Sequence, residues 1–127
     1  MASTADKGLI LLVEDERGIA SAFAILLEME GYRVTLASNG LEALEQLALC
    51  RPDLIMTDCR MPVMDGLTLI SRIRAHPTHR DIPILLMSAG LPPAATAGFG
   101  GADAFLQMPA GVDALVAEIE KLLGGSR

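Results

Sequence analysis

The chain has 127 residues, a length that suits one domain built around one hydrophobic core. Hydrophobic residues make up 51% of it and aromatic residues only 3%, so aliphatic side chains must build that core. The net charge of −6 argues against a surface for nucleic acid or an anionic membrane, and no apolar stretch approaches the roughly 20 residues of a membrane span.

Patterns typical of strands and of helices alternate along the chain. Residues 8–13 are apolar almost throughout, which predicts a strand buried on both faces, as in a parallel sheet. Residues 17–30 carry apolar side chains at helical spacing, and Gly31 is a typical residue for a helix end. The remaining patterns predict strands at residues 33–37, 53–57, 82–87 and 102–107, and helices at residues 41–49, from residue 65 onward, and at residues 112–123, the last with an inward face that begins at Val112.

The stretch between the last two predicted strands gives a weaker pattern. Residues 90–93 contain two prolines, which disfavour a continuing helix, and Gly98, Gly100 and Gly101 follow. We therefore expect only a short or poorly ordered helix at about residues 93–99.

The alternation of strands and helices predicts an α/β fold. Five such units imply a doubly wound, five-stranded parallel sheet with helices on both faces. We expect one domain over residues 1–127, with its core at about residues 8–123. A polar tail at residues 1–7, which lacks the apolar centre of a signal peptide, and a Gly-rich tail at residues 124–127 would flank that core.

Two of the apolar runs end in carboxylates. Glu14 and Asp15 follow the first predicted strand, and Asp58 follows the third. Because ligands bind outside the carboxyl ends of strands in open α/β sheets, these residues form a candidate site for a divalent cation and a phosphoryl group. The alternative is structural, since Glu14 and Asp15 could cap the next helix and Asp58 could be a solvated strand end.

The end of the third strand carries a specific motif. Residues 58–66 read Asp-Cys-Arg-Met-Pro-Val-Met-Asp-Gly, and Ser88 and Phe105 follow at the ends of later strands. Together with the acidic pair after the first strand, this pattern closely resembles the receiver domain of two-component response regulators. The resemblance covers nearly the whole chain, and it implies a flavodoxin-like (βα)5 fold with strand order 2-1-3-4-5.

The resemblance assigns a phosphorylation site and a metal site. Asp58 would be the phosphoacceptor, forming an aspartyl-phosphate. Asp15 and Asp58 would bind Mg²⁺ directly, Glu14 would bind it through water, and the backbone carbonyl of Arg60 would complete the protein ligands. These residue types suit Mg²⁺, which prefers oxygen ligands and shares phosphate oxygens.

The resemblance also implies a switch. Ser88 would hydrogen-bond a phosphoryl oxygen, and Phe105 would change rotamer with the loop after the fourth strand. The alternatives are an ordinary loop hydroxyl for Ser88 and a core side chain for Phe105.

One position departs from the family pattern. Met108 stands before Pro109, where the family has a lysine. A methionine cannot pair with Asp58, and a charge-assisted hydrogen bond is worth about 1.5–3 kcal/mol, so the site should lose stabilisation. The guanidinium of Arg60 could replace part of the lost charge, or it could be an exposed side chain with no such contact.

The function most consistent with these residues is a response regulator receiver. Phosphoryl acceptance on Asp58 from a histidine kinase or a histidine phosphotransfer protein, with Mg²⁺ as cofactor, would switch a protein-interaction surface. Such a domain is not an enzyme beyond catalysing its own phosphorylation and dephosphorylation. Its partner would be a downstream protein or an output domain, without direct contact to nucleic acid or membrane, and a homodimer is compatible with the resemblance. Cys50 and Cys59 form neither a disulfide nor a zinc pattern, which favours the cytoplasm.

Two other functions compete with this one. The first is a phosphorylation-independent pseudo-receiver acting as a protein-binding module, which Met108 favours. The second is a Mg²⁺-dependent phosphohydrolase, which would need a second Asp two residues after the nucleophile. Arg60 occupies that position, so we expect no hydrolase activity.

Overall fold

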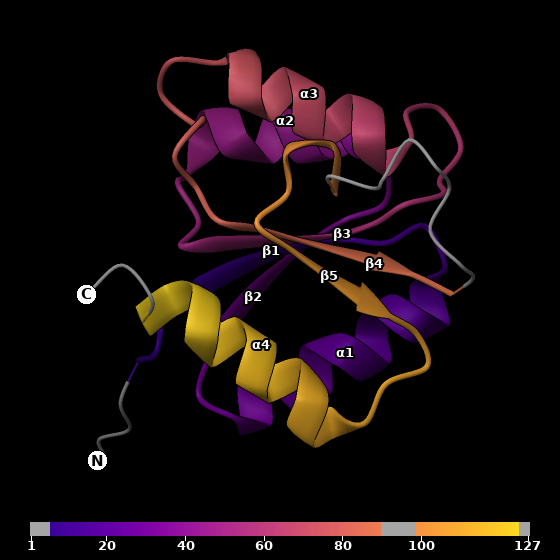
Figure 1. The fold of residues 1–127 in the computed structure, drawn as a ribbon, viewed down its shortest axis with the longest axis vertical. Coiled ribbons are helices and arrows are strands. Elements are labelled where there is room, and N and C mark those ends of the chain that lie inside the picture. The colour runs from indigo at the N-terminus through magenta and orange to yellow at the C-terminus, as the bar shows by residue number, and fades with distance from the viewer. Residues whose placement is uncertain (1–5, 90–98, 125–127) are drawn as a thin grey trace.

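The computed structural model describes residues 6–89 and 99–124, which form a single parallel sheet between two layers of helices (Figure 1). The helix expected at residues 93–99 lies outside the described residues, except for Phe99. Phe99 begins a short turn of 3₁₀ type, η2 (Phe99–Gly101).

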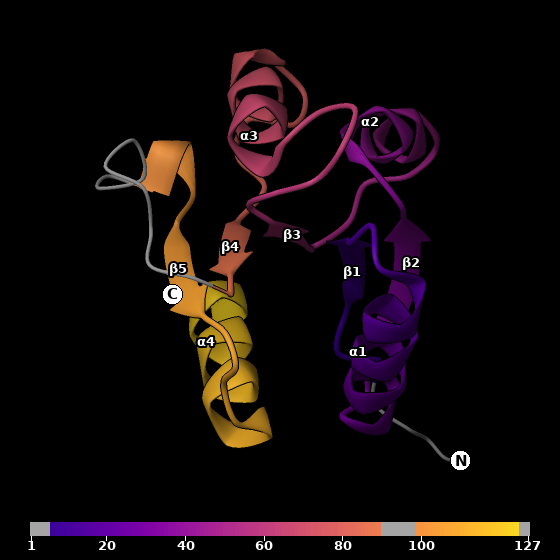
Figure 2. The ribbon, with the colours of Figure 1, turned by 90° about the vertical axis from the view of Figure 1, so that its right-hand side faces the viewer.

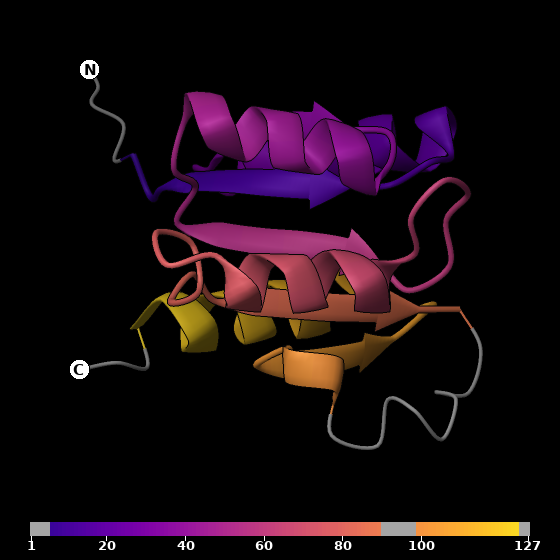
Figure 3. The same cartoon turned by 90° about the horizontal axis from the view of Figure 1, so that it is seen from above.

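All five predicted strands are present, and they run in one direction (Figure 3). Their order is β2-β1-β3-β4-β5, which confirms the doubly wound topology. The fourth strand begins two residues later than predicted, because Pro83 has no N–H to donate to the ladder. The strands are β1 (Leu9–Val13), β2 (Arg33–Ala37), β3 (Leu54–Asp58), β4 (Ile84–Ser88) and β5 (Ala104–Gln107).

Two helices cover each face of the sheet (Figure 2). Helices α1 (Arg17–Met29) and α4 (Val112–Gly124) lie on one face, and α2 (Gly40–Leu49) and α3 (Gly66–Ala75) lie on the other. Alternate side chains of the central strands point to opposite faces, so the sheet separates two apolar clusters. The cluster on the α1–α4 side includes Ile10, Leu12, Leu27, Met56, Leu85 and Ile119; the cluster on the α2–α3 side includes Leu11, Val13, Ile55, Leu69, Ile73 and Leu86.

The inward face of α4 begins later than predicted. Val112 remains 41% exposed, so its assignment to the inward face was wrong. It is the first residue of the helix, and the buried positions start with Leu115 and continue with Ile119, one turn further.

The end of α1 confirms the predicted role of Gly31. Its φ of 104° is a conformation that side chains other than glycine rarely adopt. This conformation lets the N–H of Tyr32 donate to the carbonyl of Leu27 at 3.1 Å. It also lets the N–H of Gly31 donate to the backbone carbonyl of Glu28 at 3.0 Å. These two bonds satisfy carbonyls that the helix would otherwise leave unpaired, and they turn the chain into β2.

Arg74, in the last turn of α3, connects that helix to the edge of the sheet. Its guanidinium donates to the carbonyls of Gly101, Arg80 and Ile82 at 2.6–2.8 Å. It also pairs with the carboxylate of Asp103 at 2.7 Å. The same carboxylate oxygen accepts the N–H of Ile84 at 2.8 Å, so one arginine holds the segments that begin β4 and β5.

Candidate phosphoacceptor and metal site

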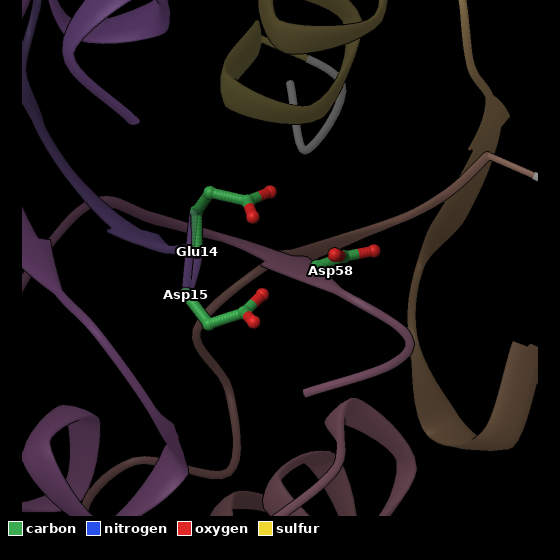
Figure 4. A group of neighbouring side chains, drawn as sticks. All are labelled: Glu14, Asp15 and Asp58. Carbon is green, nitrogen blue, oxygen red and sulfur yellow. The ribbon is translucent and has the colours of Figure 1, made fainter. Parts of the chain in front are cut away.

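Three carboxylates gather at the carboxyl edge of the sheet (Figure 4). Glu14 and Asp15 directly follow β1, and Asp58 is the last residue of β3. Since β1 and β3 are paired neighbours, with Val13 opposite Thr57, their ends lie side by side. One oxygen from each of the three side chains lies within 4.8 Å of the others, a spacing that could hold a metal ion.

Glu14 is the most deeply buried member of the cluster. Only 6% of it is exposed, and its Oε2 accepts the N–H of Glu16 at 3.0 Å. Burial raises the pKa of Glu14 to about 7; the Glu16 N–H opposes this shift, and the negative charges of Asp58 and Asp15 add to it.

Asp58 is partly buried, and the loop that follows it holds its carboxylate. Its Oδ1 accepts the N–H of Cys59 at 2.8 Å. Burial raises the pKa of Asp58 and the charge of Asp15 raises it further, while the N–H groups of Cys59 and Arg60 favour the ionised carboxylate. The cluster therefore concentrates negative charge that a bound cation would offset.

The loop after β3 packs against Asp58 at Gly66. The N–H of Gly66 donates to the carbonyl of Cys59 at 2.9 Å. A Cβ on Gly66 would lie only 2.2 Å from the carbonyl oxygen of Asp58, so α3 could not start this close to β3 with any other residue. The first helical residue thus fixes the backbone that carries the Asp58 carboxylate.

A mostly apolar pocket of about 290 Å³ adjoins the carboxylates. Sequence reasoning did not find this pocket: Ile19 and Phe23 had only the spacing of core residues in α1, yet both line it, and Ile19 is 46% exposed. Its walls combine Glu14 and Asp58 with Ile19, Phe23, Met87, Ala89, Met108 and Pro109.

The two predicted switch residues lie on neighbouring strands, Ser88 at the end of β4 and Phe105 within β5. Ser88 ends β4, next to Met87, which is the register partner of Asp58. The Ser88 carbonyl accepts the N–H of Met108 at 2.7 Å. Phe105 packs against the apolar cluster on the α2–α3 side, whereas Met108 packs against the cluster on the α1–α4 side. The sheet therefore lies between Phe105 and the pocket that Met108 lines.

Arg60 is exposed, and its backbone N–H, which hydrogen-bonds the Asp58 carboxylate, lowers the pKa of that group. Within residues 6–89 and 99–124, the ion pairs are Arg33–Asp6 and Arg74–Asp103. The Arg60 guanidinium accordingly forms no ion pair with the acidic cluster in the described part of the chain.

The raised pKa of Glu14 predicts a pH-dependent stability in the absence of metal. An unfolded glutamate loses its proton near pH 4.5, whereas folded Glu14 keeps it up to about pH 7. Between these values the folded state binds more protons, so its stability falls as the pH rises. Urea unfolding at several pH values should show this fall in the wild type and a smaller one in Glu14→Gln. An exposed control, Glu28→Gln, should behave as the wild type, and an equal slope in all three proteins would contradict the shift.

None of the helices in the described ranges combines the length and the apolar character needed to cross a bilayer. The fold thus places the chain among the doubly wound α/β domains, in which ligands bind at the carboxyl edge of the sheet, and the three carboxylates lie at this edge.

Comparison with known proteins identifies the family. Residues 10–120 match the model of the response regulator receiver domain, so the chain belongs to that family. Its members are phosphoacceptor modules of two-component signalling rather than true enzymes, and they interact with histidine kinases.

A curated relative and two solved structures are similar to the chain. Response regulator MprA of Mycobacterium leprae is 39% identical over 116 residues, which are 90% of this chain and 50% of the relative. The chain thus spans about half the length of the curated relatives it matches. The receiver domain of a signal transduction histidine kinase from Syntrophus aciditrophicus has a TM-score of 0.88 and 36% identity, over 94% of this chain and 92% of the other. The receiver domain of the sensor histidine kinase PA1611 from Pseudomonas aeruginosa, with a magnesium ion coordinated in its active site cleft, has a TM-score of 0.86 and 31% identity, over 94% and 99% of the two chains.

Proposed function

We propose that Asp58 accepts a phosphoryl group in a Mg²⁺-dependent reaction and that this switches a surface for a partner protein. The observation that carries the proposal is the meeting of Glu14, Asp15 and Asp58 at adjacent strand ends. An Asp58 oxygen would bond to phosphorus while the bond from phosphorus to the donor breaks. A histidine donor would leave as neutral imidazole after taking up a proton.

The residues of this site fit Mg²⁺. Glu14, Asp15 and Asp58 offer the hard oxygen ligands that this ion prefers, and the backbone carbonyl of Arg60 is proposed to join them. When bound, the ion would offset the negative charge on the carboxylates and on the phosphoryl oxygens. The magnesium ion in the PA1611 receiver domain supports this assignment by similarity.

Ser88 and Phe105 are proposed to report the phosphorylated state. Ser88 lies at the end of β4, within the edge that carries Asp58, which suits a hydroxyl that contacts the phosphoryl group. Phe105 lies on the far side of the sheet from the pocket, which suits a residue that carries the change toward another face. Met108 is proposed to weaken this coupling, because it supplies no charge to the phosphoryl group.

Phosphorylation by a small phosphodonor tests the proposal. Wild-type protein incubated with acetyl phosphate and Mg²⁺ should gain one phosphoryl group in intact-mass spectrometry, and omission of Mg²⁺ should prevent it. Asp58→Asn should not be modified, because the amide is not a nucleophile of this kind. Asp81→Asn, an exposed aspartate before β4, is the matched control and should react as the wild type.

Metal binding is measured separately by thermal unfolding. Millimolar Mg²⁺ should raise the melting temperature of the wild type, since a ligand that binds the native state stabilises it by mass action. Asp15→Ala should lose this response, and Asp81→Asn should keep it. An unresponsive wild type would contradict the metal site.

A phosphorylation-independent binding module is the second candidate. Met108 favours it, because this residue gives the site an apolar wall beside Asp58. This candidate predicts that Asp58→Asn binds the partner protein with the same affinity as the wild type, and that the affinity of the wild type is the same with and without phosphodonor. The phosphorylated receiver is proposed to have a histidine kinase or phosphotransfer protein as its upstream partner and a protein or output domain as its downstream partner.

A further inference from the structure

The pocket beside Asp58 has two chemically distinct parts. Phe23, Met87 and Met108 are among its apolar walls, and Glu14 and Asp58 supply carboxylates. Its volume of about 290 Å³ exceeds the cavity of about 150 Å³ that is known to hold benzene in an apolar protein core. A short unbranched chain of carbon atoms therefore fits the pocket, and a charged end would meet the carboxylates.

Within the part of the chain that the structure describes, no cationic side chain pairs with the carboxylates of this pocket. Both ion pairs in residues 6–89 and 99–124 lie elsewhere, and residues 90–98 contain neither Lys nor Arg. Asp15, which completes the metal cluster, is not among the residues that line the pocket. The pocket therefore shares Glu14 and Asp58 with the metal cluster but reaches them past apolar walls, and their negative charge is complementary to a cationic group that enters along those walls.

We propose that this pocket binds a lysine side chain supplied by the protein that exchanges phosphoryl groups with Asp58. The proposal rests on the proposed function, because that function defines the partner. The four-carbon stem packs against Phe23, Met87 and Met108, and the ammonium group donates hydrogen bonds to Asp58 and Glu14. The apolar walls suit the stem, and a compact ammonium with three donors suits two carboxylates from different strands better than a planar guanidinium.

The n-butylammonium ion, which reproduces a lysine side chain, is the probe for this pocket. It is titrated into wild-type protein with saturating Mg²⁺ at constant ionic strength, and the methyl resonances of Met87 and Met108 are followed by NMR. We expect saturable shifts of both, with an affinity about tenfold higher than that of n-butanol, which lacks the charge. Ammonium ion, which lacks the stem, should shift neither. Three results would overturn the proposal. Equal binding of n-butanol would mean that the occupant is a neutral apolar group, and equally tight binding of n-propylguanidinium would mean that it is an arginine. The absence of saturable shifts would mean that the pocket binds none of these groups.

A pair of methionine variants provides the second measurement. Met108→Lys places an ammonium group in the pocket from within the chain, so it should lose most binding of n-butylammonium, followed at the Met87 methyl. Met29→Lys adds the same charge at a position on α1 that is 77% exposed, and it should bind the probe as the wild type does. Unchanged binding in Met108→Lys, with a folded protein, would overturn the assignment of the pocket. Should Met108→Lys fail to fold, the wild-type titration still decides.

The two proposals fail in different ways. If n-butylammonium binds but Asp58 is not phosphorylated by acetyl phosphate, the proposed function is wrong, and with it the identity of the partner. If Asp58 is phosphorylated but the probe does not bind, only the lysine pocket is wrong.

Discussion

Replacing Gly66 with alanine should destabilise the fold by about 3 kcal/mol and impair phosphoryl acceptance. The added Cβ would lie 2.2 Å from the carbonyl oxygen of Asp58 and 3.1 Å from the Cα of Cys59. These neighbours are backbone atoms, so no rotation of a side chain relieves the clash. Either α3 moves away from the sheet or the end of β3 shifts, and the second change displaces the Asp58 carboxylate.

Gly111→Ala is the matched control for this substitution. Nothing lies within 4 Å of a Cβ at Gly111, whose carbonyl accepts the N–H of Leu115 at the start of α4. Its free energy of unfolding should stay within about 0.5 kcal/mol of the wild type. Urea unfolding of both variants, together with the acetyl phosphate assay, makes the comparison. Wild-type stability in Gly66→Ala would show that α3 does not pack this closely against β3.

The acidic cluster is predictable from the sequence because each part ends an apolar run. Leu9 to Val13 leads directly into Glu14 and Asp15, and the third strand leads into Asp58. Parallel strands deliver their carboxyl ends to one edge, so the carboxylates had to share that edge. Their contact also requires β1 and β3 to be neighbours, and the strand order implied by the receiver resemblance supplied that step.

The pocket beside Asp58 is not predictable in the same way. Phe23 and Met87 belong to patterns of buried side chains, and a periodic pattern cannot tell a core position from the wall of a cavity. Met108 was identified only as an exception to a family pattern. Its role as a wall depends on how α1 and the ends of β4 and β5 come together, which is a property of the tertiary structure.

The contacts of Arg74 also escape sequence analysis. A basic residue in the last turn of a helix is favoured by the helix dipole alone, so Arg74 has an ordinary local explanation. Its partners Gly101 and Asp103 lie 27 and 29 positions away along the chain. Only the packing of α3 beside the starts of β4 and β5 makes these atoms neighbours.

Arg74→Ala should therefore reduce the free energy of unfolding by about 3 kcal/mol. The substitution removes four hydrogen bonds, one of them to a carboxylate, and leaves the Asp103 oxygen without its charged partner. Arg74→Lys should recover only part of the loss, because an ammonium group has no planar fork and cannot reach all of these acceptors. Urea unfolding measures both effects.

The exposed ion pair between Arg33 and Asp6 is the internal comparison. Its N–O distance of 2.8 Å nearly equals the 2.7 Å between Arg74 and Asp103, but its side chains are 60% and 56% exposed against 24% and 46%. Water and salt screen such a pair, so Arg33→Ala should cost less than about 1 kcal/mol. Equal losses in Arg33→Ala and Arg74→Ala would show that the carbonyl contacts of Arg74 contribute nothing. A larger loss in Arg74→Ala that persists at high salt would instead place its stabilising effect in those contacts, which connect α3 to the strand that carries Ser88.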